Sequence, residues 1–358
     1  MAESATEKLE GETGGESPSK RILYFDLLTI FACFAVVILH CNGSVHGFRP
    51  EASWDQALFA EVFFFWAVPV FFMLTGANNM GYRRKRGTKE FLARRMKKLL
   101  IPFLFWSIAA YLYQGIATPN GTGMSVMGFI SAFMSNSIMP IYWFFFAIIS
   151  LTLAMPALSL LANNRKVLWY IVVAQFILGS TLPVLSRLTG FPWSTSFNLP
   201  IANSWVMFAI LGYLLATEEV PRKWRIALYF AGIASLCFRF GYTYINSYAI
   251  GKVDGTLSDY GAFTTVLPAV AVFLLFKYAK WDKTLLAKHP NGVTAISSCS
   301  FGIYLIHIFI LENVLIGAFG LTITSAFIRI IGPFIVYGSS LVIVAILRRI
   351  PVLREVIP

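Results

Sequence analysis

Long runs of apolar residues, separated by short polar and charged segments, follow one another along almost the whole chain. A helix that crosses a bilayer needs roughly 20 predominantly apolar residues, and each run is close to that length. The pattern predicts an all-α, polytopic integral membrane protein with about ten transmembrane helices. The predicted spans are residues 22–41, 57–80, 99–116, 141–161, 167–185, 201–217, 226–246, 261–279, 295–316 and 324–347.

Composition supports this fold class and sets apart the N-terminal end. The mean hydropathy is +0.69 and only 13% of residues are charged, whereas about 25% is usual for soluble domains. Residues 1–19 are instead acidic, rich in Gly and Ser, and poor in apolar side chains, a composition typical of disorder. We therefore expect a disordered cytoplasmic tail over 1–19 and a transmembrane domain over 20–358.

The basic residues predict the orientation. Of the 29 Lys and Arg residues, 24 flank the spans on the side of the N-terminus, three lie in the other loops and two lie within spans. Because cytoplasmic loops carry the excess of Lys and Arg, we predict that both termini are cytoplasmic. The net charge of +12 is explained by topology in this way, so we expect no nucleic-acid partner.

Cysteine spacing gives no sign of a metal site. Cys33, Cys41, Cys237 and Cys299 all fall in or at the edge of apolar segments. Their spacing matches neither a zinc site nor a disulfide framework. We interpret them as packing residues and expect no metal cofactor.

Ionisable residues inside predicted spans are costly in a bilayer, so each is a candidate for function. Asp26 and His40 lie 14 residues apart in the first span, about 21 Å along a helix, too far for one hydrogen-bonded dyad. Asp26 suits the start of a helix. His40 lies toward the outer end, where it forms either a structural interhelical bond or a catalytic base. Glu61 is expected at the same depth, either orienting His40 or facing the outer water interface.

The ninth predicted span carries a polar stripe. Ser300, Tyr304 and His307 follow one another at helical spacing and share one face. The stripe is either a buried structural feature or part of a site. Further ionisable residues within spans are Arg239, Glu312 and Arg329.

Six segments in sequence order resemble one family. They are FDLLTIFACFAVVILH (25–40), VPVFFMLTG (68–76), FLARRMKKLLIPFLFWS (91–107), YWFFFAIISLTLAMPAL (142–158), FAILGYLL (208–215) and SFGIYLIH (300–307). Together they resemble the membrane acyltransferase type 3 family, which contains many bacterial surface-glycan O-acetyltransferases.

The resemblance implies transfer of an acetyl group from cytoplasmic acetyl-CoA to an extracytoplasmic or lipid-linked glycan acceptor, in a bacterial cell membrane. It implies that His40 is the essential histidine, as a base or as a transient acyl carrier. The catalytic candidates are therefore His40, Glu61, Asp26, His307 and Tyr304. The candidates for binding the donor are Arg94, Arg95, Lys97, Lys98 and Arg239.

The basic segment 83–98 lies on the predicted cytoplasmic side, where acetyl-CoA is available. Arginine binds phosphate well through its planar guanidinium, although topology alone also requires basic residues there. One position departs from the family pattern. Members commonly carry an arginine eleven residues before the essential histidine, and this chain has Thr29. Arg239 or Arg329 could supply the missing cation.

The expected partners are membrane lipid, the acyl-CoA donor and a glycan or lipid-linked acceptor, with a homo-oligomer left open. A transporter or flippase of a lipid-linked or small polar substrate is the alternative, because intramembrane His, Arg and Glu would also suit transport. A non-catalytic membrane scaffold is disfavoured by the number of ionisable residues in the spans.

Overall fold

The structure is a computed structural model that describes residues 22–117, 124–194, 196–197, 199 and 201–357. Every regular element in these ranges is helical, which confirms the all-α fold class. Eight helical stretches are long and apolar enough to cross a membrane, and two shorter apolar helices accompany them, so that each of the ten predicted spans has a helical counterpart. The tail predicted over 1–19 lies outside the described residues.

The helices have the following bounds. They are α1 Leu23–Cys41, α2 Ala52–Phe64, α3 Ala67–Asn79, α4 Thr88–Ala117, α5 Val126–Met134, α6 Trp143–Leu161, α7 Arg165–Gln175, α8 Leu182–Thr189, α9 Ser204–Thr217, α10 Arg222–Ile250, α11 Phe263–Tyr278, α12 Leu285–Lys288, α13 Pro290–Phe309 and α14 Gly332–Leu347. The π-helical segments are Phe176–Thr181, Ile310–Ala318 and Phe327–Ile331. The 3₁₀ segments used below are η1 Gly43–His46 and η3 Pro140–Tyr142.

The predicted span 57–80 is not one regular helix. The structure divides it into α2 and α3, with Phe65 and Trp66 between them. Pro69 lies in the first turn of α3, where it has no backbone N–H to offer the carbonyl four residues earlier, that of Phe65. The hydrophobic pattern could not reveal this interruption, because both halves are equally apolar.

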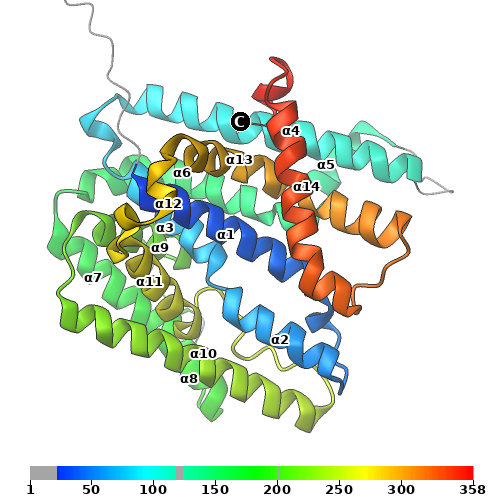
Figure 1. Ribbon diagram of the computed structural model, residues 1–358. Helices are drawn as coiled ribbons and strands as arrows, with labels where there is room; N and C mark the ends of the chain where they lie inside the picture. The colour runs from blue at the N-terminus through cyan, green and yellow to red at the C-terminus, as the bar shows by residue number, and fades with distance from the viewer. Residues whose placement is uncertain (1–21, 118–123, 195, 198, 200, 358) are drawn as a thin grey trace, which may run out of the picture.

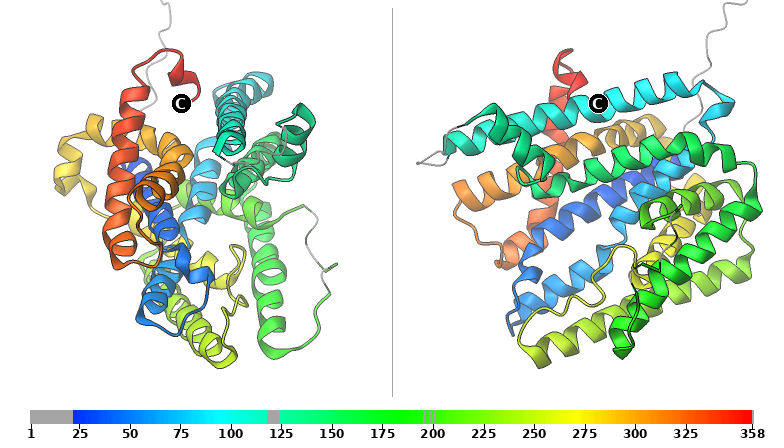
Figure 2. Two further views of the ribbon diagram at one scale, coloured as in Figure 1. Left: turned by 90° about the vertical axis from the view of Figure 1, so that its right-hand side faces the viewer. Right: turned by 180° about the vertical axis from the view of Figure 1, so that it is seen from behind.

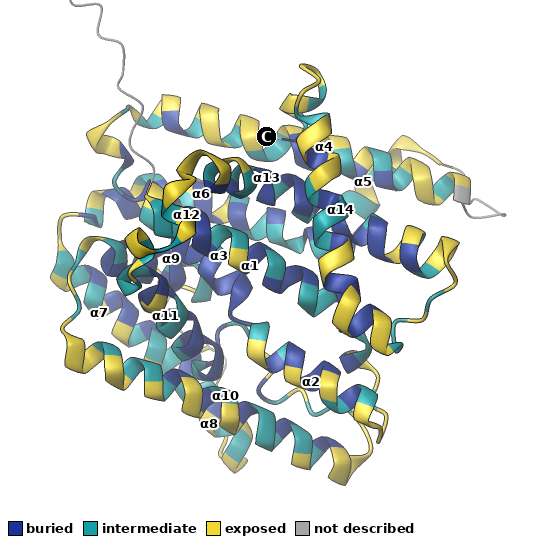
Figure 3. Ribbon diagram, viewed as in Figure 1, coloured by how far each residue is buried: buried dark blue, intermediate teal, exposed yellow. Residues whose placement is uncertain are grey.

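The buried centre contains α1, α3, α9 and α13, while long helices cover it. Figure 1 shows α4 and α10 on opposite sides of the molecule, with α1, α3 and α6 between them, and the views in Figure 2 agree. The outward faces of α4 and α10 are largely exposed (Figure 3), as expected for surfaces that contact lipid. The short α9 is buried along most of its length, from Met207 to Leu215.

Two glycines bring α3 and α9 into direct backbone contact. A Cβ added to Gly76 would lie 1.8 Å from the carbonyl oxygen of Ala209, and one added to Gly212 would lie 1.9 Å from that of Met73. In a bilayer there is little hydrophobic drive between helices, so close packing at small residues holds them together. Gly76 belongs to the VPVFFMLTG segment and Gly212 to FAILGYLL, so two of the family-like segments meet here.

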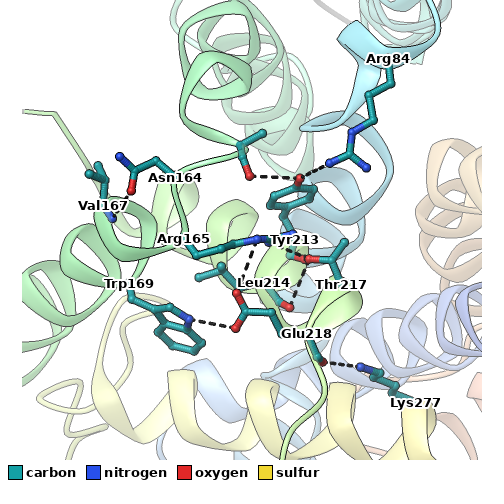
Figure 4. Close-up of polar contacts among 11 residues, drawn as sticks. Arg84, Asn164, Arg165, Val167, Trp169, Tyr213, Leu214, Thr217, Glu218 and Lys277 are labelled. Atoms are coloured by element: carbon teal, nitrogen blue, oxygen red, sulfur yellow. Dashed lines mark hydrogen bonds and ion pairs between the residues drawn. The ribbon is translucent and has the colours of Figure 1, made fainter.

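Loops at one end of the bundle, the basic end, are joined by polar contacts (Figure 4). The carboxylate of Glu218 lies 3.6 Å from Nε of Arg165 and accepts a 3.0 Å hydrogen bond from Nε1 of Trp169. Nζ of Lys277 donates to the backbone oxygen of Glu218 at 2.6 Å. These contacts tie the end of α9 to the start of α7 and to the end of α11.

The neighbouring Glu219 is an exposed carboxylate whose contacts favour its charged form. The Tyr278 hydroxyl donates a 2.8 Å hydrogen bond to it, and this bond, together with the charge of Lys277, lowers the pKa of the Glu219 carboxyl. A carboxyl with a lowered folded-state pKa stabilises the fold above its unfolded pKa, and that contribution is lost as pH falls through the folded value. The contact is thus fully formed at neutral pH.

Cysteine labelling can test which end of the helix bundle faces outward, the basic end or the opposite one. We expect Glu51→Cys to react with a membrane-impermeant maleimide on intact cells, and Lys89→Cys to react only after permeabilisation, both in a Cys237→Ser background. Glu51 and Lys89 are exposed and lie at opposite ends of the helix pair α2–α3. The reverse labelling pattern would overturn the orientation that the basic residues predict.

Candidate active site

The main cavity lies between α1, α2, α6 and α13 and has a volume of about 510 Å³. Its walls include polar residues from three helices: His40, Glu61, Ser300, Tyr304 and His307. The first belongs to α1, the second to α2 and the last three to α13. Apolar and aromatic side chains make up most of the rest, which is the usual make-up of a ligand site.

Two histidines face each other in this cavity. His40 lies in the last turn of α1 and is half-buried, whereas His307 in α13 is fully buried. Their ring centroids are 5.0 Å apart, with 49° between the ring planes. His40 is therefore the more accessible member of this pair.

Backbone contacts fix the tautomer of His307. Its Nδ1 lies 2.8 Å from the carbonyl oxygen of Tyr304 and 3.1 Å from that of Ile303. A carbonyl oxygen only accepts hydrogen bonds, so Nδ1 carries the proton. Nε2 is then an acceptor, and it has no hydrogen-bond partner among the described residues. A buried imidazole with a free lone pair thus stands next to His40.

Tyr304 has a positioning contact. Its hydroxyl donates to the carbonyl oxygen of Ile141 in η3, and Tyr142 in turn donates to the carbonyl oxygen of Leu305 at 3.4 Å. These reciprocal bonds fasten α13 to the segment that precedes α6. The hydroxyl proton of Tyr304 is committed to this contact, so the residue holds the stripe in place.

Glu61 has a different partner from the one predicted. Its carboxylate lies 3.8 Å from Nη2 of Arg239 in α10, and the guanidinium of Arg239 lies 4.0 Å from the ring centroid of Phe65. The ring beside His40 is that of His307, and an orienting role of Glu61 toward His40 stays a prediction. Glu61 lines the same cavity as His40.

Asp26 lies far from this site. It is in the first turn of α1 and accepts a 2.9 Å hydrogen bond from the Thr294 hydroxyl of α13. It does not line the main cavity. Thr29, one turn on, donates its hydroxyl to the carbonyl oxygen of Phe25 within α1. Asp26 therefore joins two helices near the basic end.

The basic candidates for donor binding lie on the surface at the start of α4. Arg94, Arg95, Lys97 and Lys98 are all exposed. Arg94 pairs with Glu90 at 2.8 Å and Lys97 with Glu355 at 2.9 Å. None of the four lines the main cavity, and Arg239 lies apart from them on α10. The sequence had grouped the five as one set, and the structure separates Arg239 from the rest.

An aromatic wall of the cavity was missed by sequence reasoning. Phe65 stacks on Tyr260 with ring centroids 4.2 Å apart and planes 3° apart, and Tyr260 stacks on Trp143 at 5.5 Å. All three line the main cavity. Trp143 lies in the YWFFF segment, so the resemblance offered a signal for it. Tyr260 is in a loop, where no sequence pattern marked it.

Comparisons with known proteins identify the family of this chain. A family model described as an acyltransferase domain matches residues 22–349, nearly the whole chain. The chain belongs to the membrane acyltransferase type 3 family. A serine/alanine racemase of Enterococcus gallinarum is 24% identical over 301 residues, 79% of this chain, and the chain spans 40% of that protein's length. No solved structure matches the chain.

Five of the six family-like segments of this acyltransferase lie at the cavity or at the contact between α3 and α9. The first and last bring His40 and His307 to the cavity, and the YWFFF segment supplies Trp143. The VPVFFMLTG and FAILGYLL segments form the contact between α3 and α9. The remaining segment, which begins with FLARRMKK, lies in the first half of α4 and contributes no cavity residue.

Proposed function

We propose that this acyltransferase moves an acetyl group from acetyl-CoA on the cytoplasmic side to a hydroxyl group of an extracytoplasmic or lipid-linked glycan, in a bacterial cell membrane. The observation that carries the proposal is the pair His40–His307. A half-buried histidine faces a cavity lined by apolar side chains, and a fully buried histidine of fixed tautomer stands beside it.

In the proposed reaction, His40 takes the proton of the acceptor hydroxyl while that oxygen bonds to the acetyl carbonyl carbon. The C–S bond of the thioester breaks, and the coenzyme A thiolate receives the proton from His40. The products are an acetyl ester and free coenzyme A, and the enzyme ends unchanged. General-base catalysis of this kind contributes about 10²–10⁴-fold to rate.

His307 acts as a positioning residue in this proposal. Its Nε2 lone pair can accept a hydrogen bond from a protonated nitrogen of His40, which would turn the other His40 nitrogen toward the acceptor. A partner that orients a catalytic base in this manner also stabilises the imidazolium that forms. The same arrangement permits His40 to carry the acetyl group as an acetyl-imidazole. Labelled enzyme that accumulates without acceptor would identify that route.

The test of the function is a transfer assay with purified enzyme in liposomes. We expect labelled acetyl from acetyl-CoA to appear in an alkali-labile ester on cell-envelope glycan or lipid-linked saccharide, with one free thiol released per ester. A transporter or flippase would move its substrate without consuming acetyl-CoA. Substrate movement without any acetyl-CoA-dependent ester would therefore overturn the proposal.

The donor site can be tested with one pair of substitutions. Arg94→Gln with Arg95→Gln should raise the KM for acetyl-CoA about tenfold, which corresponds to about 1.4 kcal/mol, because guanidinium groups bind phosphate in a bidentate manner. The matched control is Arg222→Gln with Lys223→Gln, which removes two exposed charges at the start of α10. Equal KM values for acetyl-CoA in the two double variants would mean that Arg94 and Arg95 do not bind the donor. Their role would then be only to set the orientation of the helices in the membrane.

A further inference from the structure

A second cavity, here named the outer chamber, adjoins the main cavity. It has a volume of about 250 Å³ and lies between η1, α2, α10 and the loop that follows α10. His46, Glu61 and Phe65 line both cavities. They therefore form the wall that the outer chamber shares with the cavity of His40.

The outer chamber contains buried donors that lack acceptors. Arg239 is 1% exposed and Thr243, one turn further along α10, is 2% exposed, and both line the chamber. Within the described parts of the chain, Nε and Nη2 of Arg239 and Oγ1 of Thr243 have no hydrogen-bond partner. Buried polar groups in proteins are almost always hydrogen-bonded. The chamber is thus suited to a ligand that brings acceptor oxygens.

The charges of the chamber favour a neutral ligand. Arg239 and Glu61 are 3.8 Å apart and carry opposite charges, so a carboxylate or phosphate beside Arg239 would also stand close to Glu61. A hydroxyl group avoids this repulsion. Its oxygen accepts from Arg239 or Thr243, and its proton can be donated to Glu61. Several hydroxyl groups on one ring would satisfy all three side chains together.

We propose that the outer chamber binds the hydroxyl-bearing part of the acceptor, a neutral sugar ring or similar polyol, and that Arg239 and Thr243 determine this specificity. The inference rests on the proposed function, because it takes the acceptor to be a glycan. Binding there brings a hydroxyl to the wall formed by Glu61, His46 and Phe65, beyond which His40 lies.

The first test measures binding without catalysis. Ser258 lines the chamber and is exposed, so Ser258→Cys in a Cys237→Ser background reports access by its rate of maleimide labelling. We expect at least one of a panel of methyl glycosides of neutral hexoses and pentoses, at millimolar concentration, to slow labelling about fivefold. Acetate and phosphate should not slow it. No protection by any glycoside, or protection by the anions alone, would overturn the proposal.

Substitutions then test whether Arg239 and Thr243 are responsible for the protection of Ser258→Cys by glycosides. Thr243→Val removes the hydroxyl with little change of shape and should reduce protection. The matched control is Thr264→Val, since Thr264 is another buried threonine with an unpartnered hydroxyl, on α11 and outside the chamber. Arg239→Gln with Glu61→Gln removes both charges together, so no unpaired charge is left buried, and should abolish protection. Protection that survives both variants contradicts the proposal.

Kinetics separate this proposal from the proposed function. Thr243→Val should raise the KM for the acceptor about fivefold and leave the KM for acetyl-CoA unchanged. A raised donor KM instead would assign the chamber to acetyl-CoA and overturn the inference. If glycosides protect Ser258→Cys but no acetyl ester ever forms, the chamber stands and the acetyltransferase function fails. If acetyl esters form but no glycoside protects Ser258→Cys, the acetyltransferase function stands and the proposal for the outer chamber fails.

Discussion

Replacing His40 by alanine is expected to lower the rate of acetyl transfer by about 10²–10⁴-fold, which is the usual contribution of a general base. His40 is the partly exposed member of the histidine pair that lines the main cavity. The measurement is turnover at saturating acetyl-CoA and acceptor, with purified protein. His289→Ala serves as the matched control, since His289 is an exposed histidine just before α13, outside the cavity. It should leave turnover unchanged.

The role of His307 is distinguished by a conservative variant. His307→Ala should lower kcat about tenfold or more, with a shifted pH profile, because His40 loses the acceptor beside it. His307→Gln retains an acceptor oxygen and should recover part of that loss.

Near-normal turnover of His40→Ala, in protein that is folded and inserted, would instead make His40 structural and transfer the catalytic role to His307.

Substituting Gly212 by alanine is expected to cause a large loss of stability. The added methyl group would lie 1.9 Å from the backbone of α3, and no change of side-chain rotamer on α3 can relieve a contact with backbone. Overpacking of a core typically costs 1–3 kcal/mol, occasionally more, and here we expect at least about 3 kcal/mol. Gly76→Ala should act similarly, because its methyl group would meet the backbone of α9.

The measurement is the melting temperature of the purified protein in detergent. Gly241→Ala is the matched control, because Gly241 is also a helical glycine, in α10, and an added Cβ meets no atom within 4 Å. It should be neutral or slightly stabilising, since alanine is the better helix former. Equal melting temperatures for Gly212→Ala and Gly241→Ala would show that the two helices separate without cost.

Several features of the site could be anticipated from single helices. The stripe Ser300–Tyr304–His307 shares one wall of the cavity because helical spacing fixes which residues of one helix lie on one face. Asp26 and His40 could be separated by length alone, and the structure keeps them apart. The resemblance to the acyltransferase family directed attention to His40 and to the family-like segments.

The sequence by itself determined that the apolar runs are helical and approximately where most of them begin and end. Backbone N–H and C=O groups inside a bilayer must be hydrogen-bonded within the protein. An apolar run long enough to span the bilayer is therefore expected to be helical. Only the tertiary structure decided which side chains meet between helices. It paired Glu61 with Arg239, set His307 beside His40, and brought Gly76 and Gly212 into contact with neighbouring backbones. These partners depend on the rotation and crossing of helices far apart in the chain, which spacing within one helix cannot fix.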